Sequence, residues 1–289
     1  MTTAVLLTAT GLGLAALYFL VASGLTLIFG LMDVLNFAHG ALVGLGGYVG
    51  WTVASELPGS PGLVLGLLGG VAAGAAAAAV TELAVIRPLY GRPLDQVLAT
   101  VGLGLAVPAL LQAVWGADAR TWILPGWLAG TVDLAGARVP SVRFLLIGLA
   151  LALLLGLRLL LGRTRAGLIV RAGVEDREMV TALGIDVRRA NLAVFALGGA
   201  AAGLAGALFG LYQGSVSPGD GTSLLIFAFV VVVLGGAGSI TGTALAAVAV
   251  GLVQQYADYA SASLGDESVV VLLAAVLLLR RRDLRGRPA

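Results

Sequence analysis

Long apolar runs constrain the fold of this 289-residue chain more than any other feature. Runs of about 20 residues, the length that a helix needs to cross a bilayer, recur from end to end. Only 11% of the residues are charged, whereas a soluble domain has roughly 25%. The sequence therefore predicts an all-α polytopic membrane protein in which residues 1–289 form one transmembrane domain.

We expect a bundle of about eight to nine transmembrane helices, two of which are broken. The predicted spans are 4–30, 33–54, 62–86, 97–115, 142–162, 191–213, 222–236, 239–260 and 267–280. All 17 basic residues are Arg, and 14 of them lie in the loop 87–96, the segment 158–189 and the tail from 280. Positively charged loops stay in the cytoplasm. The tail is therefore expected inside and the uncharged N-terminus outside, which gives nine crossings.

The first predicted break is the polar stretch 33–40, which contains the only histidine of the chain. Non-helical backbone at membrane depth is tolerated only where it faces protein or water, and broken helices mark substrate paths in transporters. This predicts Asn36, His39 and Gly40 in a substrate pathway. The alternative is a structural knot that locks two helices together, and the residues alone leave both open. Asp33 is expected to cap the following helix.

The second predicted break is glycine-rich, and its candidate pathway residues are Gly235, Gly236, Gly238 and Ser239. Ser239 or Thr241 is expected to cap the next helix. A helix N-terminus aimed into a pore would favour a carboxylate, although the sequence alone slightly favours a tight helical hairpin turn. Residues 29–50 and 229–251 also form a faint internal repeat, of the kind seen in transporters with paired broken helices.

The longest charged stretch, 163–189, carries an apolar stripe at helical spacing and predicts an amphipathic helix on the cytoplasmic side. Such a helix lies on the membrane or docks into a groove of a partner. A C-terminal glycine and an N-cap at Asp186 for the helix that follows fit this interpretation. The residues expected to make the contact are Leu168, Arg171, Ala172, Glu175, Asp176, Met179, Leu183 and Gly184.

Several residue types are missing from the sequence, and their absence excludes whole classes of site. The chain has no Cys and no Lys, so it has no thiolate nucleophile, and it lacks the lysine of a standard P-loop. One His cannot build a multi-His metal site. A secondary transporter would need buried carboxylates, and the spans offer little beyond Glu82 and Asp258. An intramembrane enzyme with His39 as base and Ser239 as nucleophile is the remaining alternative.

These stretches, in this order, resemble the permease subunits of branched-chain amino acid ABC transporters of the LivH type. The resemblance covers residues 10–282 and is most specific at Asn36-Phe37-Ala38-His39-Gly40, after Gly24-Leu25-Thr26-Leu27-Ile28-Phe29-Gly30. Further matches are Arg87-Pro88-Leu89, then Arg165-Ala166-Gly167, Arg171-Ala172, Glu175-Asp176 and Ala182-Leu183-Gly184-Ile185, and finally Leu234-Gly235-Gly236-Ala237-Gly238-Ser239-Ile240 with Gly242. The chain departs from the family at Arg280-Arg281-Arg282, where a longer apolar end is usual.

The resemblance implies a transport subunit of a bacterial or archaeal cytoplasmic membrane, not an enzyme. Its implied partners are a second, homologous permease, two ATPase subunits that hold ATP and Mg²⁺, and an extracytoplasmic substrate-binding protein. The segment 163–189 would contain the coupling helix that enters the ATPase groove. No cofactor, metal or nucleic acid is implied for this chain. Relatives within the family carry urea, short amides or other amino acids, and these remain alternative substrates.

Overall fold

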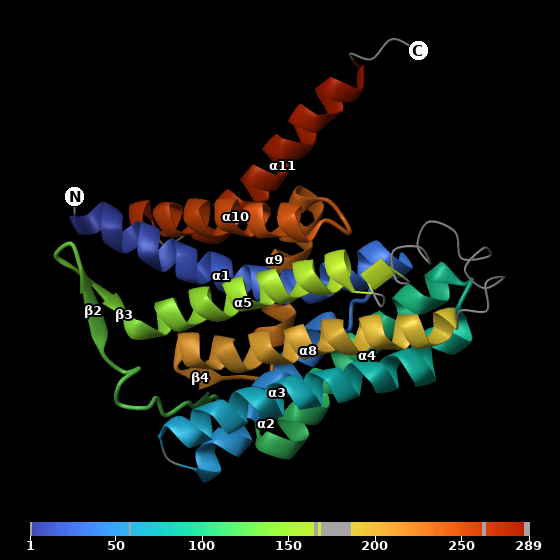
Figure 1. Ribbon diagram of the computed structural model, residues 1–289, viewed down its shortest axis with the longest axis horizontal. Coiled ribbons are helices and arrows are strands. Elements are labelled where there is room, and N and C mark those ends of the chain that lie inside the picture. Colours follow the sequence, from blue (N-terminus) through green and yellow to red (C-terminus); the bar gives the residue numbers. More distant parts are fainter. Residues whose placement is uncertain (1, 58, 165–166, 169–185, 262–263, 286–289) are drawn as a thin grey trace.

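The structure is a computed structural model that describes residues 2–57, 59–164, 167–168, 186–261 and 264–285. It is dominated by helices, most of which run along the longest axis of the molecule (Figure 1). Six of them are long and apolar enough to cross a membrane. They are α1 (Thr2–Met32), α3 (Ser60–Thr81) with its extensions η1 (Glu82–Ile86) and η2 (Arg87–Leu89), α4 (Pro93–Trp115), α5 (Ser141–Arg163), α8 (Val187–Gln213) and α10 (Ile240–Ala260). This confirms the predicted all-α polytopic membrane protein.

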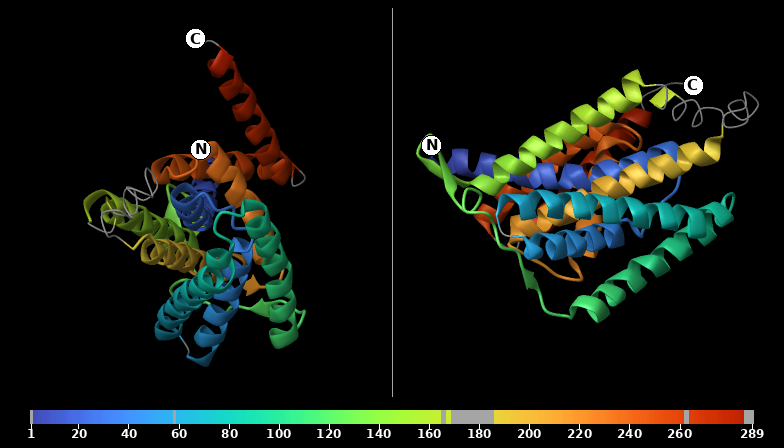
Figure 2. Two further views of the ribbon diagram at one scale, coloured as in Figure 1. Left: turned by 90° about the vertical axis from the view of Figure 1, so that its right-hand side faces the viewer. Right: turned by 60° about the horizontal axis from the view of Figure 1, so that its bottom comes forward.

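Three further helices complete the described part of the bundle: α2 (His39–Glu56), α9 (Asp220–Gly235) and α11 (Leu264–Arg285). The predicted span 33–54 is wrong at its start, because residues 33–38 are not helical and α2 begins only at His39. Helix α9 has 16 residues and is about 24 Å long, which is short for a bilayer crossing. Helix α11 leaves the bundle at an angle, so that its final residues stand away from the other helices (Figures 1 and 2).

Helix α1 is the centre of the bundle, and the other elements pack around it. Almost every side chain from Gly13 to Ile28 is buried, whereas α4 and α5 expose most of theirs. Helix α10 runs antiparallel to α1, with Gly251 against Ala15 and a hydrogen bond of 2.9 Å between the hydroxyls of Thr26 and Thr243. A helix that is hydrophobic on all sides suits this central place.

Glycines bring α2, α3 and α8 into backbone contact along what we call the glycine seam: Gly46 on α2, Gly70 and Gly74 on α3, and Gly199 and Gly203 on α8. A Cβ atom added at Gly203 would lie 2.1 Å from the carbonyl oxygen of Gly70, and one added at Gly46 would lie 2.3 Å from Gly203 Cα. Small residues at helix crossings let backbones approach closely in membranes. The seam accounts for part of the unusual total of 43 glycines.

The loop 116–140 carries short strands at the end of the bundle where α1 begins. Strand β1 (Arg120–Thr121) pairs with β4 (Ser215–Val216), and β2 (Thr131–Leu134) pairs with β3 (Ala137–Pro140). The two-residue turn of the second pair has φ of 52° at Ala135 and 82° at Gly136, which is the type I′ geometry that matches strand twist. The sequence analysis did not foresee this hairpin.

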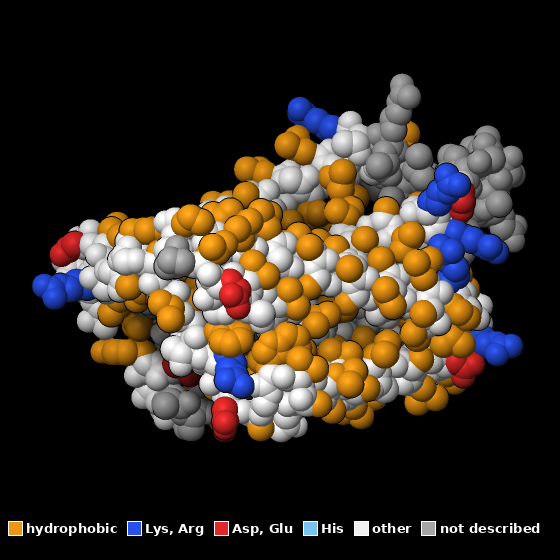
Figure 3. All heavy atoms as spheres, turned by 90° about the horizontal axis from the view of Figure 1, so that it is seen from below, with side chains coloured by type: hydrophobic (Ala, Val, Ile, Leu, Met, Phe, Trp, Pro, Cys, Tyr) orange, Lys and Arg blue, Asp and Glu red, His pale blue; other side chains and the backbone are white. Residues whose placement is uncertain are grey.

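The surface between the two ends of the long axis is mainly hydrophobic, and most charged side chains lie at the ends, with a few between them (Figure 3). Arg87, Arg163 and Arg188 all lie at the end where α1 finishes, which we call the Met32 end. An apolar belt between charged rims is the surface that a bilayer requires.

Candidate functional site

The first break lies between α1 and α2. The chain leaves α1 at Asp33, whose φ is 54° and whose N–H donates to Phe29 O over 2.9 Å. Asp is one of the few residues that adopt this left-handed conformation readily. The expectation that Asp33 caps α2 is wrong, because the N-cap position of α2 is Ala38, and it has no side-chain cap.

After Asp33 the chain turns back into the bundle. His39 is fully buried, and its Nε2 donates a hydrogen bond to Val21 O at 3.0 Å. Val21 precedes the end of α1 by eleven residues, which at 1.5 Å per residue places His39 about 16 Å from the Met32 end. Helix α2 therefore begins near the middle of the membrane, and the break lies at membrane depth as predicted.

Two buried polar atoms at this break have no partner among the described residues. Asn36 uses its Oδ1 to accept from Ala38 N at 3.1 Å, but its Nδ2 makes no hydrogen bond. The Nδ1 of His39 is also unpartnered, and both side chains are fully buried. Such groups are rare in folded proteins and point to water or a ligand at some stage of function.

Helix α9 begins at the same depth as α2. A Cβ atom added at Gly221 would lie 2.0 Å from Gly40 O, and one added at Gly40 would lie 2.5 Å from Gly221 O. The N-termini of α2 and α9 thus meet in mid-membrane, and the two helices leave this point in opposite directions. We call them the mid-depth helices. Each contributes the positive end of a helix dipole to one place.

The second break is a tight turn between α9 and α10, as the sequence slightly favoured. Gly236 and Gly238 have φ of 85° and 81°, a conformation that side chains disfavour. Ser239 caps α10 by accepting from Gly242 N at 3.0 Å, which confirms one of the two predicted caps. The hydroxyl of Thr241 instead accepts from Arg158 at 2.8 Å.

The second break packs against the end of α1, where the first break begins. A Cβ atom added at Gly30, in the last turn of α1, would lie 2.1 Å from Gly238 Cα. His39 contacts Gly24, whereas the turn before Ser239 contacts Gly30, nearly two helical turns further along α1. The structure therefore does not bring His39 and Ser239 together as a base and a nucleophile. The two halves of the faint repeat touch at Gly30 with Gly238 and at Phe37 with Phe229.

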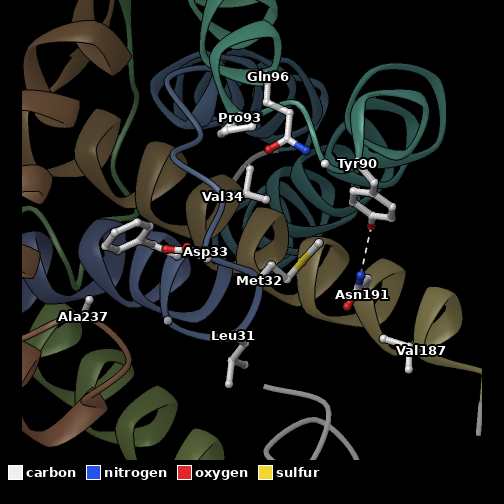
Figure 4. A pocket seen from close by; sticks show the side chains of 13 residues that line it. Leu31, Met32, Asp33, Val34, Tyr90, Pro93, Gln96, Val187, Asn191 and Ala237 are labelled. Carbon is white, nitrogen blue, oxygen red and sulfur yellow. Dashed lines mark hydrogen bonds between the residues drawn. The ribbon is translucent and has the colours of Figure 1, made fainter. Parts of the chain in front are cut away.

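A cavity of about 560 Å³ opens between the two breaks at the Met32 end (Figure 4). Among the described residues, Asp33 is the one charged side chain that lines it, and it is joined by the polar Tyr90, Gln96 and Asn191. The remaining lining residues are mainly apolar: Phe29, Gly30, Leu31, Met32, Val34, Gly91, Pro93, Val187 and Ala237. A small molecule with an apolar body and a charged group fits this mixture.

None of the residues predicted for the pathway lines this cavity, although their neighbours do. Asn36, His39 and Gly40 lie deeper in the bundle, while Gly235, Gly236, Gly238 and Ser239 form the turn beside Ala237. Their role in a pathway remains a prediction. Tyr90, Gln96 and Asn191 were not among the predicted site residues. Their only signal was polarity near a helix end, which is common at membrane boundaries.

Most residues predicted for partner contact lie outside the described residues: Arg171, Ala172, Glu175, Asp176, Met179, Leu183 and Gly184. Leu168 is described and is 62% exposed. The predicted cap at Asp186 is confirmed, since its Oδ1 accepts from Arg188 N at 3.0 Å and Arg189 N at 3.4 Å. The segment 163–189 thus leads directly into α8, whose first two turns line the cavity at Val187 and Asn191.

Residues 7–280 match the family described as the permease component of the branched-chain amino acid transport system. The branched-chain amino acid permease protein BraD of Pseudomonas aeruginosa is 31% identical, with 96% of this chain and 94% of that protein covered. LivH of Escherichia coli is 27% identical over the same shares.

A more distant relative is the autoinducer 2 import system permease protein LsrD of Escherichia coli. It is 32% identical over 210 residues, which cover 67% of this chain and 62% of that protein. No solved structure matches the chain.

Proposed function

Because the chain belongs to the family of branched-chain amino acid transport permease components, we propose that it moves branched-chain amino acids inward as the membrane-spanning subunit of an ABC importer. The meeting of the mid-depth helices carries this proposal. Helix N-termini that converge at the membrane midplane favour an anionic group such as a substrate carboxylate. The contact between Gly40 and Gly221 places two such N-termini together.

The cavity supports the same substrate class. Asp33 supplies one carboxylate, which suits an ammonium group, and Phe29, Leu31 and Met32 supply apolar wall. A branched-chain amino acid combines these two requirements. Urea and short amides are neutral and would gain no charge pairing from the Asp33 carboxylate. They remain the alternative substrates of this proposal.

The proposed partners are those that membership of the family implies, and the composition agrees with them. The chain has no lysine, so we assign ATP and Mg²⁺ to two separate ATPase subunits that dock against the segment 163–189 at the Met32 end. A second, homologous permease would complete the pathway, and an extracytoplasmic binding protein would deliver substrate at the opposite end. The arginines at the Met32 end support a cytoplasmic location for that end and for the C-terminus.

The direct test is uptake by the assembled importer. The permease pair, its ATPases and its binding protein are reconstituted in proteoliposomes, and labelled leucine, glutamine and urea are offered with internal or external ATP. We expect leucine uptake that depends on the binding protein and on ATP at the Met32 side. Uptake without ATP would indicate a secondary transporter, and ATP-driven uptake of urea alone would overturn the substrate class.

A second prediction concerns access to the pathway, and it benefits from the absence of native cysteine. Ala237→Cys and Asp33→Cys are expected to react with a membrane-impermeant thiol reagent from the Met32 side. His39→Cys and Asn36→Cys, which replace fully buried residues, should react only when the importer is trapped during turnover. Leu105→Cys is the control, because Leu105 is 73% exposed on the apolar belt and should stay unreactive. Protection of Ala237→Cys in every state would place the pathway elsewhere.

A further inference from the structure

A chain of partly buried hydrogen bonds at the Met32 end joins three separate elements. Tyr90 Oη donates to Glu82 Oε1 at 2.8 Å, and Asn191 Nδ2 donates to Tyr90 Oη at 3.0 Å (Figure 4). Glu82 belongs to η1, Tyr90 to the loop before α4, and Asn191 to the second turn of α8. We call this set the Tyr90 bridge. It links residues that are 101 positions apart in sequence.

The bridge is built around the carboxylate of Glu82, whose burial is unfavourable. Glu82 is fully buried, and its Oε2 has no partner among the described residues. Its Oε1 receives Tyr90 and, at 3.4 Å, Arg87 Nε. A buried carboxylate is retained only where hydrogen bonds compensate its desolvation. Helix α3 also widens into π-helical geometry from Glu82 to Ile86, a distortion that often marks functional positions.

On one side the bridge holds the start of α8. Asn191 lies in its second turn, and Arg87 Nη2 donates to the Arg188 carbonyl at 3.5 Å. This part of α8 follows directly on the segment 163–189. Any displacement of that segment by an ATPase therefore pulls first on the residues that the bridge holds.

On the other side the bridge reaches the first break through α4. Gln96 Nε2 donates to Leu89 O at 3.0 Å, so α4 is tied to the loop that carries Tyr90. Thr100 Oγ1 lies 3.4 Å from Leu35 O, although its nearer acceptor is Val97 O at 3.0 Å, and a Cβ atom added at Gly104 would lie 3.1 Å from Phe37 O. The contacts from α8 to the residues before His39 are thus continuous.

We propose that the Tyr90 bridge is the positioning element through which movement at the start of α8 reaches the break at 33–38. Glu82, Tyr90 and Asn191 act through the elements that they join, and they need no contact with ATP. The inference rests on the proposed importer function. Coupling between distant sites is typically worth a 5- to 150-fold change in affinity or population. The bridge is polar, so its removal should uncouple the two ends without emptying the hydrophobic core.

The test uses the complete importer in proteoliposomes. Tyr90→Phe keeps the ring and removes both hydrogen bonds, so amino acid molecules imported per ATP hydrolysed should fall at least about fivefold. Asn191→Leu, which keeps a similar volume, should give the same loss, and the double variant should be no worse than either single variant. Tyr259→Phe is the matched control, because Tyr259 is 66% exposed at the far end of α10. Tyr259→Phe should import as many amino acid molecules per ATP hydrolysed as the wild type.

The readouts separate coupling from folding and from the proposed function itself. In Asn191→Leu, the concentration of loaded binding protein that gives half-maximal uptake should be unchanged, and so should the amount of assembled complex. A merely structural role of Asn191 would instead lower the amount of complex. The proposed role of the Tyr90 bridge would be refuted if both single variants import as many molecules per ATP as the wild type, or if both fail to assemble. Failure of the wild-type importer to take up amino acids would instead refute the proposed function.

Discussion

Gly203→Ala is expected to destabilise the protein by about 1–3 kcal/mol or more, the range found when well-packed cores are overfilled. The added methyl group would lie 2.1 Å from Gly70 O, 2.9 Å from Gly70 C and 3.1 Å from Gly74 Cα. All three atoms are backbone, so no side chain can rotate away and α3 must separate from α8. The measurement is the thermal unfolding midpoint of the purified protein in detergent, together with the yield of monodisperse protein.

Gly102→Ala is the matched control, because it makes the same chemical change in α4 at an exposed position with nothing within 4 Å. Alanine is favoured over glycine within a helix by about 1 kcal/mol, so this variant should be neutral or slightly stabilised. The two substitutions should therefore shift the unfolding midpoint in opposite directions. Equal midpoints for the two variants would mean that the glycine seam is looser in the membrane protein than the structure shows.

Leu183→Asp is expected to abolish ATP-driven uptake while leaving the permease folded. Leu183 lies outside the described residues, and the prediction rests on the stripe Leu168, Ala172, Met179 and Leu183. A charge placed in a buried contact without a partner costs several kcal/mol. A loss of about 3 kcal/mol in docking corresponds to more than a hundredfold weaker contact with the ATPase. Uptake and substrate-stimulated ATP hydrolysis are measured together, with binding-protein docking retained.

Glu175→Arg makes a useful comparison within the same segment. Charges at the rim of an interface affect specificity and association rate more than affinity, so this reversal should lower uptake far less than Leu183→Asp. Normal uptake by a well-expressed Leu183→Asp variant would remove the segment 163–189 from any coupling role. The same loss in both variants would place Glu175 in the buried part of the contact.

Hydropathy predicted the long helices well, because a bilayer sets their length. The predicted spans 142–162 and 239–260 agree with α5 and α10 to within two residues at each end. However, the number of apolar residues does not reveal how deep in the bundle a helix begins. The span predicted over 33–54 starts at His39 only because the chain turns back toward Val21, and that contact joins residues 18 positions apart. The nine crossings and the outside N-terminus stay predictions.

The candidate site was only partly predictable, for a related reason. The two breaks could be found because glycine and polar residues interrupt apolar sequence within a few positions of each other. The contact between Gly30 and Gly238 could not be found from the sequence, since it depends on how α1 and α10 pack. Tyr90 and Asn191 likewise come together from positions 101 residues apart in the sequence. Without tertiary contacts, their side chains look like ordinary polar residues at helix ends.

The glycine seam also limits which parts of the molecule can shift during a transport cycle. Helices α2, α3 and α8 are held backbone to backbone at Gly46, Gly70 and Gly203, so they have no flexible side chains between them to absorb sliding. Closely packed elements move as rigid bodies. We therefore expect α2, α3 and α8 to move together, so that a displacement that begins at the start of α8 carries α2 and α3 with it.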